Sequence, residues 1–114
     1  MIQQDDRDLS VVEPSPLPAA AFIREHADFH DVVHVYGDVD LSNSADLEQA
    51  IQMPRSVDRA LVVDLSNCVY MDSTALGVLV RAKKSLGHHF KLITLDGGNV
   101  SRLLEVSGLD RFLR

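Results

Sequence analysis

The spacing of hydrophobic and polar positions changes several times along the chain, and each change predicts a new element. Residues 32–37, within the run VVHVYGDV, alternate and are β-branched, which indicates a strand. The continuous apolar run ALVVDLS, at about residues 60–65, is typical of a buried central strand. FKLITL predicts a further strand at about residues 90–95. The segment AAAFIREH, followed by a turn at ADFHD, predicts a first strand that pairs antiparallel with residues 32–37.

Helical spacing follows the strands predicted at residues 32–37 and 60–65. Asn43, with Asp46 three residues later, suits a helix start, and Pro54 ends that helix. Residues 73–86 form a second predicted helix, for which Gly87 is a suitable end. The apolar stripes of the two helices are Leu47, Ala50 and Ile51, and Ala75, Leu76, Leu79, Ala82 and Leu86.

Glycines mark the other special backbone positions. Gly77 lies inside the second predicted helix, where we attribute it to a close approach of that helix to the sheet. Gly97 and Gly98 turn the chain after the last strand, and Asn99 is expected to cap a third helix. This helix ends where Gly108 can adopt the left-handed conformation.

The order of these elements is β-β-α-β-α-β-α. Strand–helix–strand units place parallel strands side by side through right-handed crossovers, and the opening hairpin adds an antiparallel edge. The sequence therefore predicts an α/β fold, a mixed four- to five-stranded sheet with helices packed against it. We expect one domain at residues 19–114, preceded by a flexible, acidic tail at residues 1–18 that contains three prolines.

Composition and charge narrow the possible partners. The chain has 114 residues and a net charge of −6, which disfavours nucleic acid and anionic membranes as partners. No apolar run approaches the roughly 20 residues needed to span a bilayer. The N-terminal run MIQQDDRDLS is too acidic and polar for a secretory signal. Cys68 has no second cysteine to pair with, so a cytoplasmic location is expected.

The most unusual polar feature is the triplet Asp72-Ser73-Thr74, which lies between a buried strand and an amphipathic helix. Asp72 or Ser73 could be a helix N-cap, which contributes about 1 kcal/mol. Ser73 could be a catalytic nucleophile, but DSTALG lacks the G-x-S-x-G pattern of the hydrolase elbow. Ser73 could also be phosphorylated, because a helix N-terminus tolerates the added negative charge.

The other reactive side chains, His88, His89 and Cys68, do not indicate a catalytic or metal site. His88 and His89 follow Gly87 in a predicted surface turn, and a metal site would require a third ligand that the spacing does not provide. Cys68 lies in an apolar segment and is interpreted as a small buried residue. We therefore expect no metal, no cofactor and no catalytic residue.

Three ordered runs resemble one known family. VVDLSNCVYMDSTALGVLVRAKKSL resembles the signature of the STAS domain, and more closely that of bacterial anti-sigma-factor antagonists. VVHVYGDVDLSNSADLEQAI resembles the family's second strand, first helix and the turn between them, here Gly37 to Asp40. KLITLDGGNVSRLLEVSGLDRFL resembles its last strand and the helix that follows. The resemblance covers about residues 20–114.

The resemblance implies a phosphorylation switch rather than an enzyme. Ser73 directly follows the motif aspartate, Asp72, and matches the serine that an anti-sigma-factor serine kinase, a GHKL-type ATPase, phosphorylates. The unphosphorylated family member binds that kinase and so frees a sigma factor; the phosphorylated form is released, and a phosphatase resets it. Asp40 matches a family position in the partner interface, to which we add Asp72, Ser73 and Thr74.

An alternative function without a switch stays open. In it, the chain is a constitutive STAS scaffold or a STAS subunit associated with an ABC transporter, and Ser73 is only a helix cap.

Overall fold

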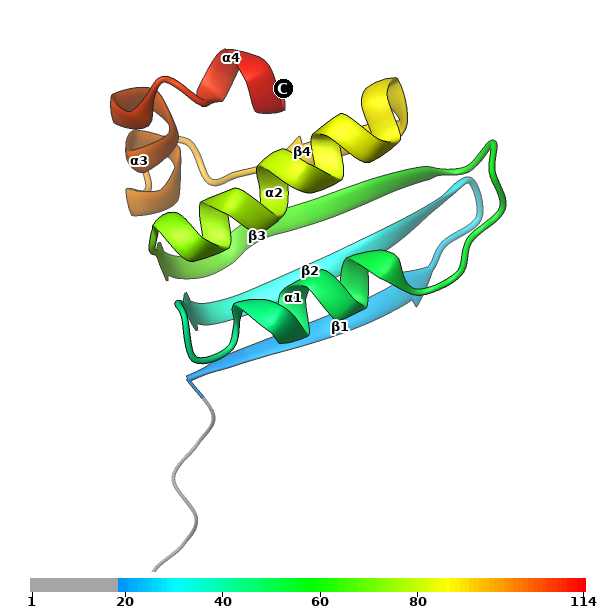
Figure 1. Cartoon of the computed structure of the whole chain (residues 1–114), viewed down its shortest axis with the longest axis horizontal. Helices are drawn as coiled ribbons and strands as arrows, with labels where there is room; N and C mark the ends of the chain where they lie inside the picture. Colours follow the sequence, from blue (N-terminus) through cyan, green and yellow to red (C-terminus); the bar gives the residue numbers. More distant parts are fainter. Residues whose placement is uncertain (1–18) are drawn as a thin grey trace, which may run out of the picture.

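The computed structural model describes residues 19–114, so the tail expected at residues 1–18 lies outside the described part. The described residues form a four-stranded sheet in the order β1-β2-β3-β4 (Figure 1). The strands are β1 (Ala20–His26), β2 (His30–Val39), β3 (Ala60–Met71) and β4 (Phe90–Ile93). The helical elements are α1 (Ser44–Gln52), α2 (Ser73–Leu86), η1 (Gly87–His89), α3 (Asn99–Ser107) and α4 (Asp110–Leu113).

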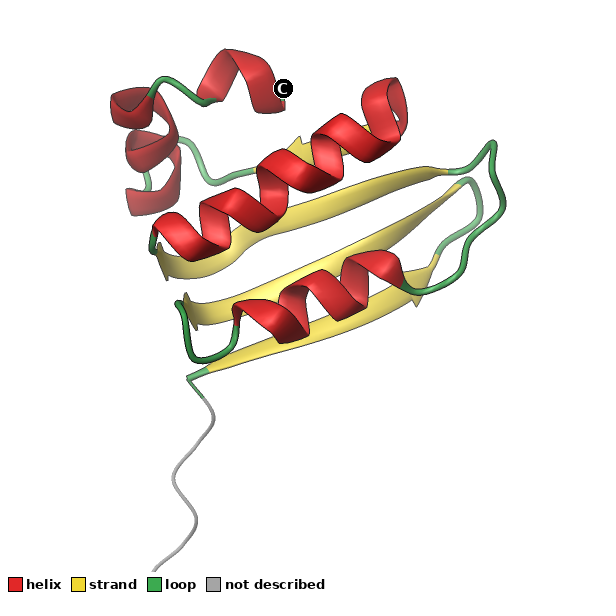
Figure 2. Ribbon diagram, viewed as in Figure 1, coloured by secondary structure: helices red, strands yellow, loops and turns green. Residues whose placement is uncertain are grey.

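The sheet is mixed, as predicted. β1 pairs antiparallel with β2, whereas β2 with β3 and β3 with β4 are parallel pairs. Helices α1 and α2 cross the same face of the sheet (Figure 2). Helix α1 contacts β1 and β2, and α2 contacts β3 and β4. None of the helices in this part of the chain is long and apolar enough to cross a membrane.

The hydrophobic core lies between the sheet and these two helices. Each fully buried aliphatic or aromatic side chain contributes about 1.5–3 kcal/mol relative to an exposed one. The core includes Val33, Val35, Leu61, Val63, Leu65 and Phe90 of the sheet, and Leu47, Ile51, Leu76 and Leu79 of the helices. The residues of the predicted apolar stripes of α1 and α2 pack in this core, so the stripes determine which side of each helix faces the sheet.

Strand β3 is longer than predicted. The strand predicted at about residues 60–65 continues to Met71. Twice along the way one extra residue of β3 is accommodated opposite β2, between His34 and Tyr36 and again between Gly37 and Asp38. Such bulges interrupt the regular alternation of a strand, which is why the segment SNCVYM was not predicted as part of it. Strand β4 is shorter than predicted and ends at Ile93.

The predicted start of α1 is confirmed in position, whereas the predicted cap of α3 is wrong. Asn43 occupies the N-cap position of α1 without a side-chain cap bond; instead it accepts from the Asp40 N–H at 2.9 Å. Gly98, not Asn99, precedes the first residue of α3. Both C-terminal predictions are confirmed, since Gly87 and Gly108 end α2 and α3 at positive φ.

The backbone requires a glycine at position 37 but not at position 77. Gly37 has a φ of +85°, and a Cβ atom there would collide with the carbonyl oxygen of Ala19. Gly77 is an ordinary helical residue, and the nearest atom to an added Cβ is Nη1 of Arg81, at 3.4 Å. The predicted close approach of α2 to the sheet at Gly77 is therefore wrong, because a flexible side chain of the same helix occupies that space.

A buried ionic network closes the end of the sheet where β2 begins. Asp31 is buried and accepts hydrogen bonds from Nη2 of Arg24 at 2.7 Å and from Nε of Arg59 at 3.2 Å, while Nδ1 of His26 lies 2.8 Å away. Arg24 also donates to the carbonyl oxygen of Ala50, near the end of α1, at 2.8 Å. Burial raises the pKa of Asp31, but these hydrogen bonds outweigh it, and the net pKa is lowered.

We expect Gly37→Ala to destabilise the fold by about 2–3 kcal/mol, because the site requires positive φ and has no room for a methyl group. Gly77→Ala is the matched control and should stabilise by about 0.5–1 kcal/mol, since alanine is the better helix former. Urea denaturation measures both. Equal effects of the two substitutions would contradict this assignment.

We expect Asp31→Asn to lower the free energy of unfolding by about 3 kcal/mol at pH 7, because it leaves buried guanidinium groups without their carboxylate. The pKa of Asp31 is lower in the folded state, so its stabilising effect is complete above about pH 4 and is lost as the pH falls through the folded pKa. The difference between wild type and Asp31→Asn should therefore shrink below pH 4. Asp58→Asn, at an exposed loop position, is the control and should change little.

Candidate functional site

The predicted site residues meet at one edge of the sheet. β2 and β3 are parallel neighbours, and they end at Val39 and Met71, which are paired in register. Helix α2 starts at Ser73, directly after β3, and the loop before α1 starts at Asp40 (Figure 1). Because parallel strands end on the same side, two segments 30 residues apart in sequence lie beside each other.

Asp72 joins these two segments. One carboxylate oxygen, Oδ1, accepts the N–H of Ala75 at 3.0 Å and so caps α2. The other, Oδ2, accepts the N–H of Leu41 at 3.0 Å, in the loop before α1. The backbone N–H of Asp72 donates to the carbonyl oxygen of Val39 at 3.1 Å. The same residue therefore starts the helix and fixes the neighbouring loop.

Ser73 has no part in this arrangement. It is the first residue of α2 and is exposed, and its hydroxyl group makes no hydrogen bond within residues 19–114. The first turn of a helix carries free backbone N–H groups and the positive end of the helix dipole. Thr74, the next residue, is half-buried. Of the two residues predicted as possible caps, Asp72 fills that role and Ser73 does not.

Asp40 lies beside the start of α2. The residues before and after it, Val39 and Leu41, are both hydrogen-bonded to Asp72. Its own Oδ1 accepts from the hydroxyl of Ser42 at 2.5 Å and from the Ser42 N–H at 2.9 Å. These bonds, the hydroxyl first, lower the pKa of Asp40. The four residues predicted to bind a partner are thus brought together, with Asp40 ionised at neutral pH.

The structure adds apolar side chains that the sequence analysis missed. Leu41 is 76% exposed beside Asp72, and Val106 of α3 is 80% exposed. Val106, Tyr70 and Leu103 line a shallow apolar depression of about 300 Å³, together with Met71, two residues before Ser73. The available signal was Val106 itself, since it lies outside the buried stripe of α3. Exposed apolar groups of this kind beside polar ones are common at protein interfaces.

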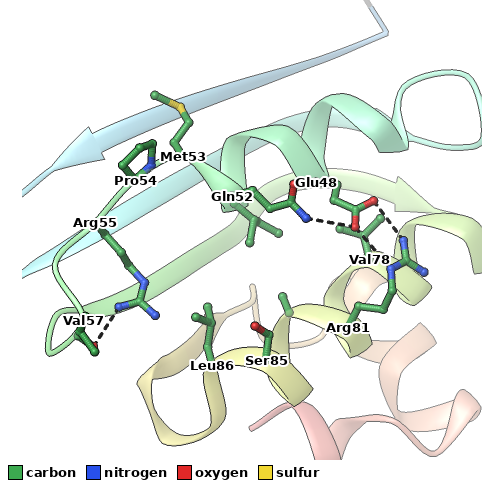
Figure 3. A pocket seen from close by; sticks show the side chains of 12 residues that line it. Glu48, Gln52, Met53, Pro54, Arg55, Val57, Val78, Arg81, Ser85 and Leu86 are labelled. Atoms are coloured by element: carbon green, nitrogen blue, oxygen red, sulfur yellow. Dashed lines mark hydrogen bonds and ion pairs between the residues drawn. The ribbon is translucent and has the colours of Figure 1, made fainter.

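A separate groove of about 510 Å³ lies between α1 and α2 (Figure 3). In Figure 3, Glu48 and Arg81 point toward each other, and their ion pair measures 3.2 Å. On the α2 side the groove is lined by residues from Val78 to Leu86, the half of the helix that is remote from Ser73. It contains none of the predicted site residues.

The remaining reactive groups are a pair of histidines and one cysteine. His88 and His89 stack with ring centroids 4.2 Å apart. Among the described residues, no group of three histidine, cysteine or acidic side chains is placed to hold a metal ion. Cys68 is buried, as predicted, and burial raises the pKa of its thiol to about 11, so it is not a reactive thiolate at neutral pH.

We expect Asp72→Ala to lower the free energy of unfolding by about 1–2 kcal/mol, because it removes the α2 cap and the bond to the Leu41 N–H. Ser73→Ala should stay within about 0.5 kcal/mol of wild type, because the exposed hydroxyl supports nothing in the fold. Chemical denaturation of the two variants measures the difference. A larger loss from Ser73→Ala than from Asp72→Ala would show that the cap is wrongly assigned.

Comparison with known proteins identifies the family. The family model described as "Mlab, STAS domain" matches residues 22–114. An anti-sigma-B factor antagonist of Staphylococcus aureus is 35% identical over 80 residues, which cover 68% of this chain and 74% of that protein. The corresponding protein of Staphylococcus epidermidis is 33% identical over 87 residues, or 74% of this chain and 80% of that one.

A solved structure agrees with these sequence matches. It is an anti-sigma factor antagonist from Mycobacterium paratuberculosis, with a TM-score of 0.73 and 28% identity, covering 87% of this chain and 86% of that one. The fold and the family predicted from the sequence are both confirmed. The chain belongs to the STAS domain family, together with bacterial anti-sigma-factor antagonists.

Proposed function

We propose that this chain is an anti-sigma-factor antagonist that docks its partner at the edge formed by Asp40, Asp72, Ser73 and Thr74. Phosphorylation of Ser73 would switch that docking off. The family and the names of the staphylococcal relatives support the general function. In this proposal the chain is a cytoplasmic binding protein and a substrate of other enzymes, not an enzyme itself.

One observation carries the proposal for Ser73. Asp72 already caps α2, so the exposed Ser73 hydroxyl is not needed by the fold and no hydrogen bond within the described residues occupies it. A kinase can reach this oxygen without unfolding the helix. The free N–H groups of the first turn also favour a negative group at this point.

The proposed modification is a phosphoryl transfer from ATP. The Ser73 Oγ attacks the γ-phosphorus and loses its proton to a base of the kinase, while the bond from that phosphorus to the β-phosphate oxygen breaks and ADP leaves. The proposed kinase is the anti-sigma factor itself, a GHKL-type ATPase. A phosphatase reverses the change by hydrolysis, which returns the hydroxyl group and releases inorganic phosphate.

The electrostatics of the edge explain how the phosphate would act. Phosphoserine carries a charge of about −1.5 to −2 at neutral pH. It would join Asp40, whose pKa is lowered, and the nearby Asp72 carboxylate. A docked partner would then meet like-charge repulsion and the cost of desolvating the phosphate. A loss of about 3 kcal/mol weakens binding by more than a hundredfold.

The affinity of the unphosphorylated form would come mainly from apolar contacts. Leu41 and Val106 are largely exposed, and Tyr70 is about half exposed. A few well-packed side chains near the centre of an interface usually supply most of the binding free energy, and tyrosine is enriched among them. The partner would therefore cover both the polar triplet and these apolar side chains, so that a charge added at Ser73 falls within the contact.

We expect Ser73→Ala to bind the anti-sigma kinase persistently in the presence of ATP and Ser73→Asp to bind at least tenfold more weakly than the unphosphorylated wild type. Ser85→Asp places the same charge at an exposed site near the other end of α2 and is the matched control. Calorimetric titration with the kinase recovered by a Ser73→Ala pull-down measures the affinities. Equal affinities for wild type and Ser73→Asp would refute the switch.

Mass spectrometry after incubation with the same kinase and ATP tests the modification directly. We expect one phosphate, on Ser73, and none on Ser73→Ala. Recovery of an ABC-transporter ATPase in the pull-down, with Ser73 unmodified, would instead support the constitutive scaffold.

A further inference from the structure

The sheet has a second face, turned away from α1 and α2 (Figure 2). Val33 and Val63 belong to the core beneath the helices, whereas their neighbours Val32 and Val62 lie outside that core cluster although they are only 7% and 8% exposed. Side chains alternate between the two faces of a sheet. We call the second face the open face, and its central residues are Ile23, Glu25, Val32, His34, Val62, Asp64, Lys91 and Ile93.

Strand register arranges these residues in two rows that cross all four strands. In the first row, Ile23 of β1 is paired with His34 of β2, His34 with Asp64 of β3, and Asp64 with Ile93 of β4. This row therefore has the same residue at both ends. At its centre, a histidine on one middle strand lies beside an acid on the other.

The second row is complementary from end to end. Glu25 of β1 is paired with Val32, Val32 with Val62, and Val62 with Lys91 of β4. An acid and a base thus stand at opposite ends, and two valines occupy the middle. If a second copy of each row is placed opposite the first in reversed strand order, the β1 residue faces the β4 residue and the β2 residue faces the β3 residue. Each facing pair is then either two apolar side chains or two that can carry opposite charges.

We propose that the open face is the interface of a homodimer. A twofold axis parallel to the strands, between two sheets stacked face to face, places β1 of one copy over β4 of the other, and β2 over β3. Ile23 then meets Ile93 of the second copy, and Glu25 meets its Lys91. In the middle, His34 faces Asp64 and Val32 faces Val62. A twofold interface requires this self-complementarity.

The face has the apolar content that such packing needs. Ile23 is 52% and Ile93 is 47% exposed, so both have area left to bury, and Tyr36 of β2 adds a partly exposed aromatic ring. Aligned sheets stack about 10 Å apart with their strands about 30° from parallel. Because stacked twisted sheets diverge toward their corners, the contacts between the middle strands are expected to be the closest.

The charges balance when His34 is protonated. Among the eight central residues, the charges of Glu25, Asp64, His34⁺ and Lys91 then sum to zero, and to −1 when His34 is neutral. Nε2 of His34 lies 2.6 Å from Oε1 of Glu25, and Nδ1 lies 3.4 Å from Oδ2 of Asp64. The contact with Glu25, with a smaller effect of Asp64, outweighs burial and raises the pKa of His34. His30, Tyr36 and Asp38 are the other ionisable side chains at alternate positions of β2 on the same face.

Dimerisation is independent of the function proposed for Ser73. Ser73 begins α2, and the covered face of the sheet lies beneath that helix, whereas the open face is on the other side. Two copies joined through their open faces would present two Ser73 sites outward. Loss of the dimer should therefore leave phosphorylation of Ser73 intact, and loss of Ser73 should leave the dimer intact.

Sedimentation equilibrium of the full chain, from about 1 to 500 µM, tests the proposal. We expect a concentration-dependent monomer–dimer equilibrium that weakens several-fold between pH 6 and pH 8, as His34 loses its proton. Ile93→Asp should weaken dimerisation at least tenfold, because it buries a charge opposite Ile23. Val57→Asp, at an exposed apolar site in the loop before β3, is its control and should have no effect.

A charge reversal supplies a second test that does not depend on burying a polar group. Lys91→Glu should weaken the dimer at least tenfold, whereas Lys84→Glu, which makes the same charge change at an exposed site on α2, should leave it unchanged. Circular dichroism confirms that each variant is folded. A wild-type chain that stays monomeric at 500 µM, or a folded Ile93→Asp and Lys91→Glu that dimerise as tightly as wild type, would overturn the proposal.

Discussion

The arrangement of the site depends on the two hydrogen bonds that the Asp72 carboxylate accepts. One oxygen caps α2 at Ala75, and the other holds the backbone of Leu41 in the loop before α1. Parallel strands bring the two loops to the same edge, but pairing alone does not fix their relative position beyond the last residues of β2 and β3. The hydrogen bonds of Asp72 fix the positions of the two loops beyond the strand ends, so that Asp40 and Ser73 lie on one surface.

Asp72 and Asp31 lie at opposite ends of the sheet, and their different hydrogen-bond partners give them different structural roles. Asp31 is buried, and two arginines and a histidine satisfy it, so its role is to hold β1, β2 and the end of α1 together. Asp72 accepts only backbone N–H groups, at the rim of the fold. A paired buried acid mostly fixes structure. An acid bound only to backbone N–H groups keeps its negative charge at the surface, where it adds to the field around Ser73.

The sequence was sufficient for the features that depend on periodicity. The stripe of α2 and the glycines that end α2 and α3 follow directly from spacing and from the cost of positive φ, and both were predicted correctly. The second half of β3 was missed because two extra residues break the alternation of SNCVYM, and only pairing with β2 reveals the strand. Asn43 was predicted as a cap from its type, but its side chain instead bonds the Asp40 N–H and the Asp38 carbonyl oxygen.

The site was predictable to the extent that it is local in sequence. The triplet is continuous, and the resemblance of its motifs to the STAS family pointed to Ser73 and Asp40 together. The exposed side chains of Tyr70 and Val106 come from a strand and a helix that only the fold brings to one depression, and Leu41 comes from the loop bound to Asp72. The exposure of Leu41 and Tyr70 could not be predicted from hydrophobicity, because an apolar residue in a sequence is more often buried than exposed.

Because Asp72 caps α2 and Ser73 does not, phosphorylation of Ser73 would not require a change in the fold. If Ser73 were the cap of α2, a phosphate on its oxygen would remove a bond on which the first turn depends. With Asp72 as the cap, the added charge meets free N–H groups of the helix and neighbouring acids on the surface, but no core contact. Modification of Ser73 would then change what the edge repels while leaving the sheet, the helices and the open face in place.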